Sequence, residues 1–106
     1  MDRELSLSRV GGDSELLKEI AVLFIEDYPN MISDLRGAFA RSDAKAVERA
    51  AHSLKGSVAN FGARAAVEAA LKVEDLGRSR QLDQVPPLLD SLDQTLAILH
   101  RELETL

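Results

Sequence analysis

The residues with the clearest chemical potential lie together in the stretch AHSLKGSVANFGA, residues 51–63. His52 can serve as a nucleophile or a metal ligand, because a neutral imidazole offers a free ring nitrogen near pH 7. Lys55 follows at i+3 and Gly56 at i+4, which are neighbouring positions on a helix surface. A molecule that approaches the imidazole would therefore meet a cation and an uncrowded stretch of backbone, which Ala59 extends.

The apolar spacing around His52 predicts which way its side chain points. With successive residues about 100° apart around a helix axis, four apolar residues form one stripe that must face the core. These are Val47, Ala51, Leu54 and Val58. The opposite, solvent-facing side carries Lys45, Glu48, Arg49, His52, Lys55, Gly56 and Ala59. A glycine within a helix costs about 1 kcal/mol relative to alanine, so an exposed Gly56 indicates close approach by another molecule.

Two other interpretations of this stretch compete with a nucleophilic role. His52 would be incidental, and Gly56 a tolerated defect, if the pattern arose by chance, as five-residue patterns readily do. Alternatively, Glu48 and His52 would form a metal-binding pair at i and i+4. Zinc needs three or four ligands, however, and the other histidine of the chain, His100, is on the last predicted helix. We therefore expect no metal site, and we expect His100 to be a partly buried packing residue.

Helices predicted along the rest of the chain would hold this stretch in place. Alanine and leucine dominate, and the apolar spacing is helical almost throughout. A brief helix at 3–10 should end at Gly11-Gly12, and Asp13 should cap the next one. Pro29 should start or bend a helix. Further boundaries are expected at the RSD sequence of residues 41–43, at the Asn60-Phe61-Gly62 turn, at the end of a helix spanning about 63–79, and at Pro86-Pro87.

The remaining apolar stripes indicate how these helices pack. The helix capped by Asp13 should bury Leu16, Leu17, Ile20, Leu23 and Phe24, and the segment after Pro29 carries Ile32, Leu35 and Phe39. The last helix has Leu88, Leu92, Leu96, Leu99 and Leu103. This pattern predicts an all-α fold, an antiparallel up-down four-helix bundle with a short N-terminal capping helix. The length of 106 residues fits a single domain, 1–106.

Composition argues against several functional classes. The net charge is −5, and the chain has only three Phe, one Tyr and no Trp, which is unlike the basic, aromatic surfaces that bind nucleic acid. The absence of cysteine removes disulfides and thiolate zinc sites and fits a reducing compartment. No apolar run is long enough for a membrane span, and the N-terminus is charged where a signal peptide is apolar. We therefore expect a cytoplasmic protein without membrane insertion.

With its flanks, the His52 stretch resembles the histidine-containing phosphotransfer (HPt) domain of two-component phosphorelays. The similarity covers most of the chain and rests on RVGGDSELL at 9–17, Phe24 in LFIEDYP, AHSLKG at 51–56, Gly62, and VEDLGR at 73–78. The last of these is similar to the family's Leu-Glu-x-Leu-Gly-Arg segment. Val58 is a departure, because many members have a serine there, but it falls on the core stripe and should not affect the chemistry.

The resemblance implies that His52 is the phosphoacceptor, which takes a phosphoryl group from an aspartyl phosphate of a receiver domain and passes it to a response-regulator aspartate. It further implies that Lys55 partly neutralises the phosphoryl oxygens and that Glu74 orients the imidazole through its other ring nitrogen. The receiver-docking face would comprise Gly56, Ala59, Glu48 and Arg49.

The expected partners are receiver domains of response regulators or of a hybrid histidine kinase. The chain has no Gly-rich phosphate loop and no carboxylate cluster for magnesium, and phosphoryl transfer depends on positioning and charge neutralisation. We therefore expect no cofactor here, Mg²⁺ only on the partner receiver, and a phosphocarrier rather than an enzyme. We also expect a monomer, as is usual in the family.

Three different functions would use some of the same residues. The dimerisation domain of a sensor histidine kinase also carries a phosphohistidine on a helical bundle, but there an acidic residue follows the histidine and a proline usually comes a turn later. Here Ser53 follows, and residues 54–58 read Leu-Lys-Gly-Ser-Val. The phosphotransfer domain of a chemotaxis-type kinase and a non-catalytic helical adaptor bundle are also compatible with the helical pattern.

Overall fold

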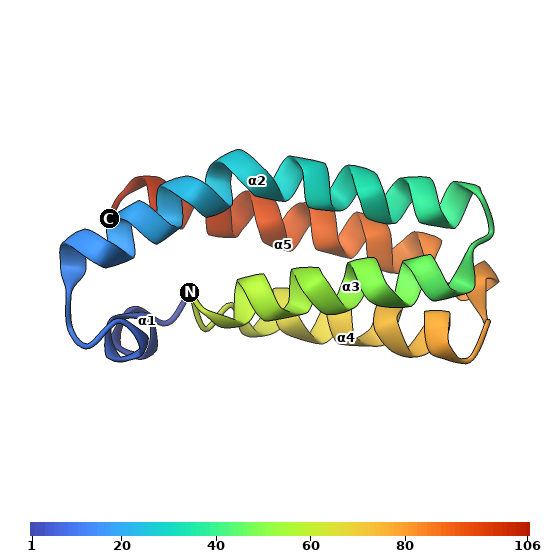
Figure 1. The fold of residues 1–106 in the computed structure, drawn as a ribbon, viewed down its shortest axis with the longest axis horizontal. Coiled ribbons are helices and arrows are strands. Elements are labelled where there is room, and N and C mark those ends of the chain that lie inside the picture. The colour runs from blue at the N-terminus through green and yellow to red at the C-terminus, as the bar shows by residue number, and fades with distance from the viewer.

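The computed structural model describes residues 1–106 and contains helices but no strands. Four long helices lie side by side with alternating direction, and a short helix lies across one end, near the N-terminus (Figure 1). The predicted all-α bundle is confirmed. Its elements are α1 (Arg3–Arg9), α2 (Ser14–Ala40), α3 (Ala44–Ala59), α4 (Arg64–Arg78), the 3₁₀ turn η1 (Leu82–Gln84) and α5 (Pro86–Glu104).

Aspartates fix the starts of the first three helices. In each case the carboxylate accepts a hydrogen bond from the backbone N–H three residues later, which satisfies an amide that has no partner within the helix. The pairs are Asp2 with Leu5, Asp13 with Leu16 and Asp43 with Ala46, at 3.0 to 3.1 Å.

The turn between α3 and α4 contains a glycine for a steric reason. Gly62 has a φ of +60°, and a Cβ there would lie 2.5 Å from the Cβ of Asp2. The backbone N–H of Asp2 also donates to the carbonyl of Phe61 at 2.8 Å. This turn therefore fastens the start of α1 to the end of the α3–α4 pair.

Pro29 lies inside α2, which runs unbroken from Ser14 to Ala40. Of the two expectations for Pro29, that it starts a helix or that it bends one, the first is wrong, because the proline stands within one long helix. A proline deprives a helix of one hydrogen bond. Buried residues on both sides of it, Phe24 before and Leu35 after, pack into the bundle and keep the two halves in one helix.

The buried stripe of α2 is narrower than expected. Leu17 and Phe24 are buried, and together with Ala21 they occupy positions i, i+4 and i+7. Leu16 and Leu23 were expected in the core, but they are 39% and 63% exposed. Each stands one residue before a member of the buried stripe and is therefore rotated about 100° around the helix axis from it. These two positions therefore contribute an apolar surface rather than core.

The core lies along the axis of the bundle. All four residues of the predicted α3 stripe are fully buried. In α5 the predicted leucines are buried except Leu88, whose place in the core is taken by Leu89. No buried side-chain polar atom lacks a hydrogen-bond partner.

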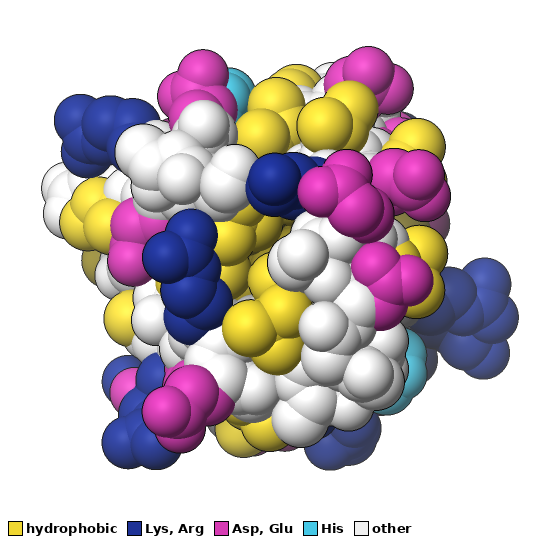
Figure 2. Space-filling view, turned by 90° about the vertical axis from the view of Figure 1, so that its left-hand side faces the viewer, with side chains coloured by type: hydrophobic (Ala, Val, Ile, Leu, Met, Phe, Trp, Pro, Cys, Tyr) yellow, Lys and Arg dark blue, Asp and Glu magenta, His cyan; other side chains and the backbone are white.

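Viewed from the end where α1 lies, hydrophobic side chains reach the middle of the surface, and charged ones lie mostly toward its edge (Figure 2).

None of the helices combines the length and the apolar character that a membrane crossing requires.

Candidate functional site

His52 stands near the middle of α3, and 68% of its side chain is exposed. Its neighbours Ala51 and Leu54 face the core and are fully buried. The prediction that His52 points to solvent is therefore confirmed. One edge of the imidazole nevertheless contacts α4, which runs beside α3 in the opposite direction (Figure 1).

Glu74 of α4 joins the two chemically reactive side chains of α3. Its carboxylate is buried, with only 4% of the residue exposed. Oε2 lies 2.7 Å from Nδ1 of His52, and Oε1 accepts a 2.6 Å hydrogen bond from Nζ of Lys55. Glu74 was assigned an orienting role only through the family resemblance, and the structure brings it into contact with both residues.

The ionisation of Glu74 determines which nitrogen of His52 carries a proton. Burial raises the pKa of Glu74, but hydrogen bonds from Lys55 and His52, together with the positive charges of those side chains, outweigh burial and bring the net pKa below the ordinary value of 4.5. The carboxylate is therefore ionised at neutral pH and can only accept hydrogen bonds. Nδ1 must then carry the hydrogen, which leaves the lone pair on Nε2, the nitrogen turned away from Glu74.

Arg78 extends this network along the line of contact between α3 and α4, which we call the α3–α4 seam. Its Nε donates to Oε2 of Glu48 at 3.0 Å, Nη1 donates to Asp75 at 3.2 Å, and Nη2 lies 3.5 Å from Oε2 of Glu74. The hydrogen bond to Glu48 raises the pKa of Arg78. Glu48, predicted to belong to the docking face, is thus also the partner of Arg78. Sequence reasoning did not assign Arg78 a role, although its position four residues after Glu74 in VEDLGR was a signal.

The surface beside His52 is low and open. A shallow hollow is lined by Glu48, Arg49, His52, Ser53 and Glu74. Gly56, one turn further along α3, is exposed, and a Cβ placed on it would meet nothing within 4 Å. Ala59 is half-buried. The uncrowded surface predicted at Gly56 and Ala59 is therefore present, and another molecule can approach it.

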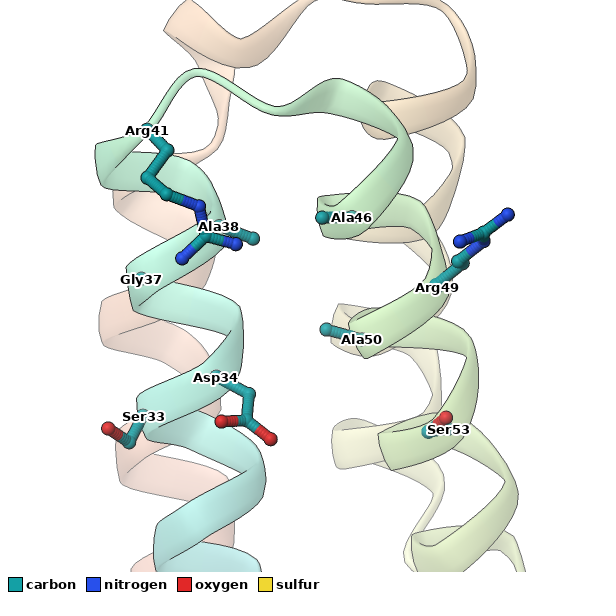
Figure 3. Close-up of a pocket in the computed structure, with 9 residues that line it drawn as sticks. All are labelled: Ser33, Asp34, Gly37, Ala38, Arg41, Ala46, Arg49, Ala50 and Ser53. Atoms are coloured by element: carbon teal, nitrogen blue, oxygen red, sulfur yellow. The ribbon is translucent and has the colours of Figure 1, made fainter.

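A second hollow of about 430 Å³ separates the C-terminal half of α2 from α3. In Figure 3, Asp34 and Arg41 point toward the gap, whereas Arg49 turns away from it. Two of its lining residues, Arg49 and Ser53, also line the hollow at His52. The complete lining is Ser33, Asp34, Gly37, Ala38, Arg41, Ala46, Arg49, Ala50 and Ser53.

Comparison with known proteins assigns the chain to a family. The family described as "Hpt domain" matches residues 19–105. The chain belongs to the Hpt domain family. Its function is accordingly histidine phosphotransfer in a two-component phosphorelay, and members of the family are phosphocarriers that work with receiver domains. The sequence resemblance to HPt domains is confirmed.

A solved structure shows the same Hpt fold. It is the crystal structure of histidine-containing phosphotransfer protein B (HptB) from Pseudomonas aeruginosa PAO1, with a TM-score of 0.91 and 23% sequence identity. The alignment covers 99% of this chain and 91% of that one, so it takes in α1 as well as the residues of the family match. No curated protein matches the chain in sequence.

The second histidine of this Hpt domain has a different environment. His100 of α5 is 31% exposed, and its Nδ1 lies 2.7 Å from the hydroxyl oxygen of Tyr28. Its prediction as a partly buried packing residue is confirmed. Glu48, considered above as a metal-binding partner of His52, accepts a hydrogen bond from Arg78 instead. No group of three or more His, Asp or Glu side chains is arranged to hold a metal ion.

Proposed function

We propose that His52 is the phosphoacceptor of this Hpt domain and that Nε2 is the reacting atom. The lone pair of Nε2 attacks the phosphorus of an aspartyl phosphate on a receiver domain, so that a P–N bond forms. The P–O bond to the aspartyl carboxyl group breaks, and its electron pair leaves with the carboxylate. Transfer to a second receiver is the same step in reverse. The observation that carries the proposal is the 2.7 Å contact between Nδ1 and Glu74, which leaves Nε2 exposed.

Glu74 stabilises the charge that this step creates. When Nε2 attacks while Nδ1 keeps its hydrogen, the imidazole ring becomes cationic. A buried carboxylate already in contact with Nδ1 requires no rearrangement to stabilise that charge. The role proposed for Glu74 is therefore both to fix the tautomer and to favour the phosphorylated ring.

Lys55 supplies positive charge near the transferred group. An ammonium has three hydrogen-bond donors, and one of them is used on Glu74. Two donors are left for phosphoryl oxygens or water. Because Lys55 follows His52 at i+3, its charge stands beside the imidazole ring, where partial neutralisation of the incoming group aids transfer.

The docking face proposed for the receiver is the exposed side of α3, formed by Glu48, Arg49, Gly56 and Ala59. The exposed Leu23 of α2 extends this face, because it lines a small apolar hollow with Ser57 of α3 and with Asn60, which follows that helix. The receiver would supply Mg²⁺ and the remaining catalytic groups, since phosphoryl transfer relies on positioning and charge neutralisation. On this proposal the chain is a monomeric phosphocarrier.

The experiment that tests this function is incubation of the chain with a panel of receivers carrying radiolabelled aspartyl phosphate and Mg²⁺. We expect acid-labile, base-stable label on the chain, mapped to His52 by mass spectrometry. His52→Gln is the negative control, and His100→Gln is the matched histidine control. Label on any other residue would contradict the assignment. A dimer in a molar-mass measurement would contradict the monomer and favour the dimerisation domain of a sensor kinase.

A further inference from the structure

Gly77 of α4 contacts the backbone of α3. It is buried, and a Cβ added to it would lie 2.7 Å from the backbone nitrogen of Glu48 and 3.0 Å from the carbonyl oxygen of Ala44. Real Cβ atoms essentially never approach a neighbour as closely as 2.7 Å. Backbone atoms within a helix cannot move aside individually, so any larger residue here would require the two helices to separate locally.

This contact lies next to the proposed phosphotransfer site. Because α3 and α4 run in opposite directions, residues that follow Glu48 on α3 face residues that precede Gly77 on α4. His52 comes one turn after Glu48, and Glu74 comes three residues before Gly77. The hydrogen bond between Glu74 and His52 is therefore the next contact along the seam from the glycine.

We propose that Gly77 is a positioning residue for phosphotransfer: it sets the separation of α3 and α4 at which the Glu74 carboxylate reaches Nδ1 of His52. The proposal rests on the function assigned to His52 above. An alanine at 77 needs roughly 0.7 Å more room to reach an ordinary 3.4 Å contact with Glu48, and the same shift at His52 would stretch a 2.7 Å hydrogen bond beyond its usual range.

The other two glycines within helices do not have this arrangement. A Cβ on Gly56 would meet open space. A Cβ on Gly37 of α2 would approach only the end of the Arg41 side chain, at 3.3 Å. That flexible group can move aside. Gly37 also lines the hollow between α2 and α3, away from the α3–α4 seam. It therefore provides a matched control for a helical Gly→Ala change.

The test is Gly77→Ala, read out by the tautomer of His52 and by the single-turnover rate of phosphotransfer. The tautomer is measured from ¹⁵N chemical shifts of the imidazole at neutral pH. We expect the Nδ1–H form to lose population in Gly77→Ala and the transfer rate to fall by about tenfold or more, as for other small misplacements of reacting groups. Gly37→Ala should retain the wild-type tautomer and rate. A folded Gly77→Ala protein with both wild-type values would overturn the proposal.

Two further variants separate positioning from general damage to the fold. In a Glu74→Gln background, Gly77→Ala should cause little additional loss of rate, because its effect passes through the carboxylate. If Gly77→Ala does not fold, Glu74→Asp tests the same distance without touching the glycine, since it shortens the side chain by one methylene. A wild-type tautomer and rate in Glu74→Asp would contradict the role of α3–α4 separation. Failure of the wild-type chain to label at His52 would instead contradict the proposed function.

Discussion

His52 and His100 each have a hydrogen-bond partner 2.7 Å from Nδ1, but the two partners differ in chemical type. The partner of His52 is the carboxylate of Glu74, which can only accept, so Nδ1 donates and Nε2 keeps its lone pair. The partner of His100 is the hydroxyl group of Tyr28. Burial raises the pKa of Tyr28, and the negative charge of Glu104 raises it further, so the hydroxyl group stays protonated and, unlike a carboxylate, can either donate or accept.

His100 also has neighbours at its second ring nitrogen and along the edge of its ring, which His52 lacks. Nε2 lies 3.6 Å from Oε1 of Glu104, and this nearby carboxylate favours a hydrogen on Nε2, with Nδ1 accepting from Tyr28. The ring also packs edge-on against Tyr28, which stacks on Phe24. Each nitrogen of His100 therefore has a polar group of the protein beside it, whereas His52 has such a contact only at Nδ1. Because the two distances are equal, the chemical type of the Nδ1 partner and the exposure of the ring distinguish the two histidines.

The largest effect expected from this contrast is on labelling. His52→Gln should abolish phosphoryl acceptance, whereas His100→Gln should accept the phosphoryl group like the wild type. The melting temperature of His52→Gln should stay close to wild type, because exposed changes usually alter stability by less than about 0.5 kcal/mol. Radiolabel transfer and thermal melts on the same preparations measure both effects. Label that persists in His52→Gln would refute the distinction between the two histidines.

A large effect is also expected from changing the access to Nε2 at Gly56. Gly56→Gln should keep or slightly raise the stability, by up to about 1 kcal/mol, because glycine is unfavourable within a helix. Transfer should nevertheless fall sharply, since the long side chain stands one turn from His52, where the receiver must approach. Gly56→Ala is the size control and should retain more of the transfer rate. Normal transfer by Gly56→Gln would show that clearance at this position has no part in docking.

Lys55→Ala should have a smaller effect on transfer. It tests the surroundings of Glu74, the Nδ1 partner of His52. The variant removes a charge beside the phosphoryl group and one of the two short hydrogen bonds to Glu74, but no core contact. We expect slower transfer with label still reaching His52 and the bundle still folded. Single-turnover kinetics and circular dichroism provide the readouts. An unchanged rate would remove Lys55 from the mechanism.

The smallest expected effect is on stability in acid, where the two Nδ1 partners should behave differently. The pKa of Glu74 is lowered in the folded chain, so its contribution to stability is complete above the ordinary value of 4.5 and is lost as the pH falls through the lower folded value. The hydroxyl group of Tyr28 does not titrate in that range. Melting temperatures measured downward from neutral pH should fall less steeply for Glu74→Gln than for the wild type. Parallel curves for the two proteins would show that protonation of Glu74 does not contribute to the loss of stability in acid.

Much of this arrangement could be predicted from local sequence. The outward direction of His52 follows from the α3 stripe, because helical periodicity is a property of one segment. The caps at Asp13 and Asp43 follow from short-range hydrogen bonding. The exposure of Leu16 and Leu23 could not be predicted in this way, because the neighbouring helices decide how wide a buried stripe is.

Contacts between helices were harder to predict than the faces of single helices. The pairing of Glu48 with Arg78 and the close approach at Gly77 depend on the register between α3 and α4, which periodicity does not specify. Glu74 was identified only because VEDLGR resembles a family segment. Pro29 shows the related difficulty that packing over a whole helix can override a local signal for a boundary.

The placement of the whole His52 network on α3 and α4 has a consequence for how the domain folds. These two helices are consecutive and joined by the short Asn60-Phe61-Gly62 turn, so every ion pair of the network closes a short loop of chain. Short loops cost little entropy to close and form quickly. The seam between Tyr28 and His100, by contrast, joins residues 72 positions apart in the sequence. The α3–α4 half of the domain, which carries His52, is therefore expected to assemble early in folding, and the packing of α5 against α2 late.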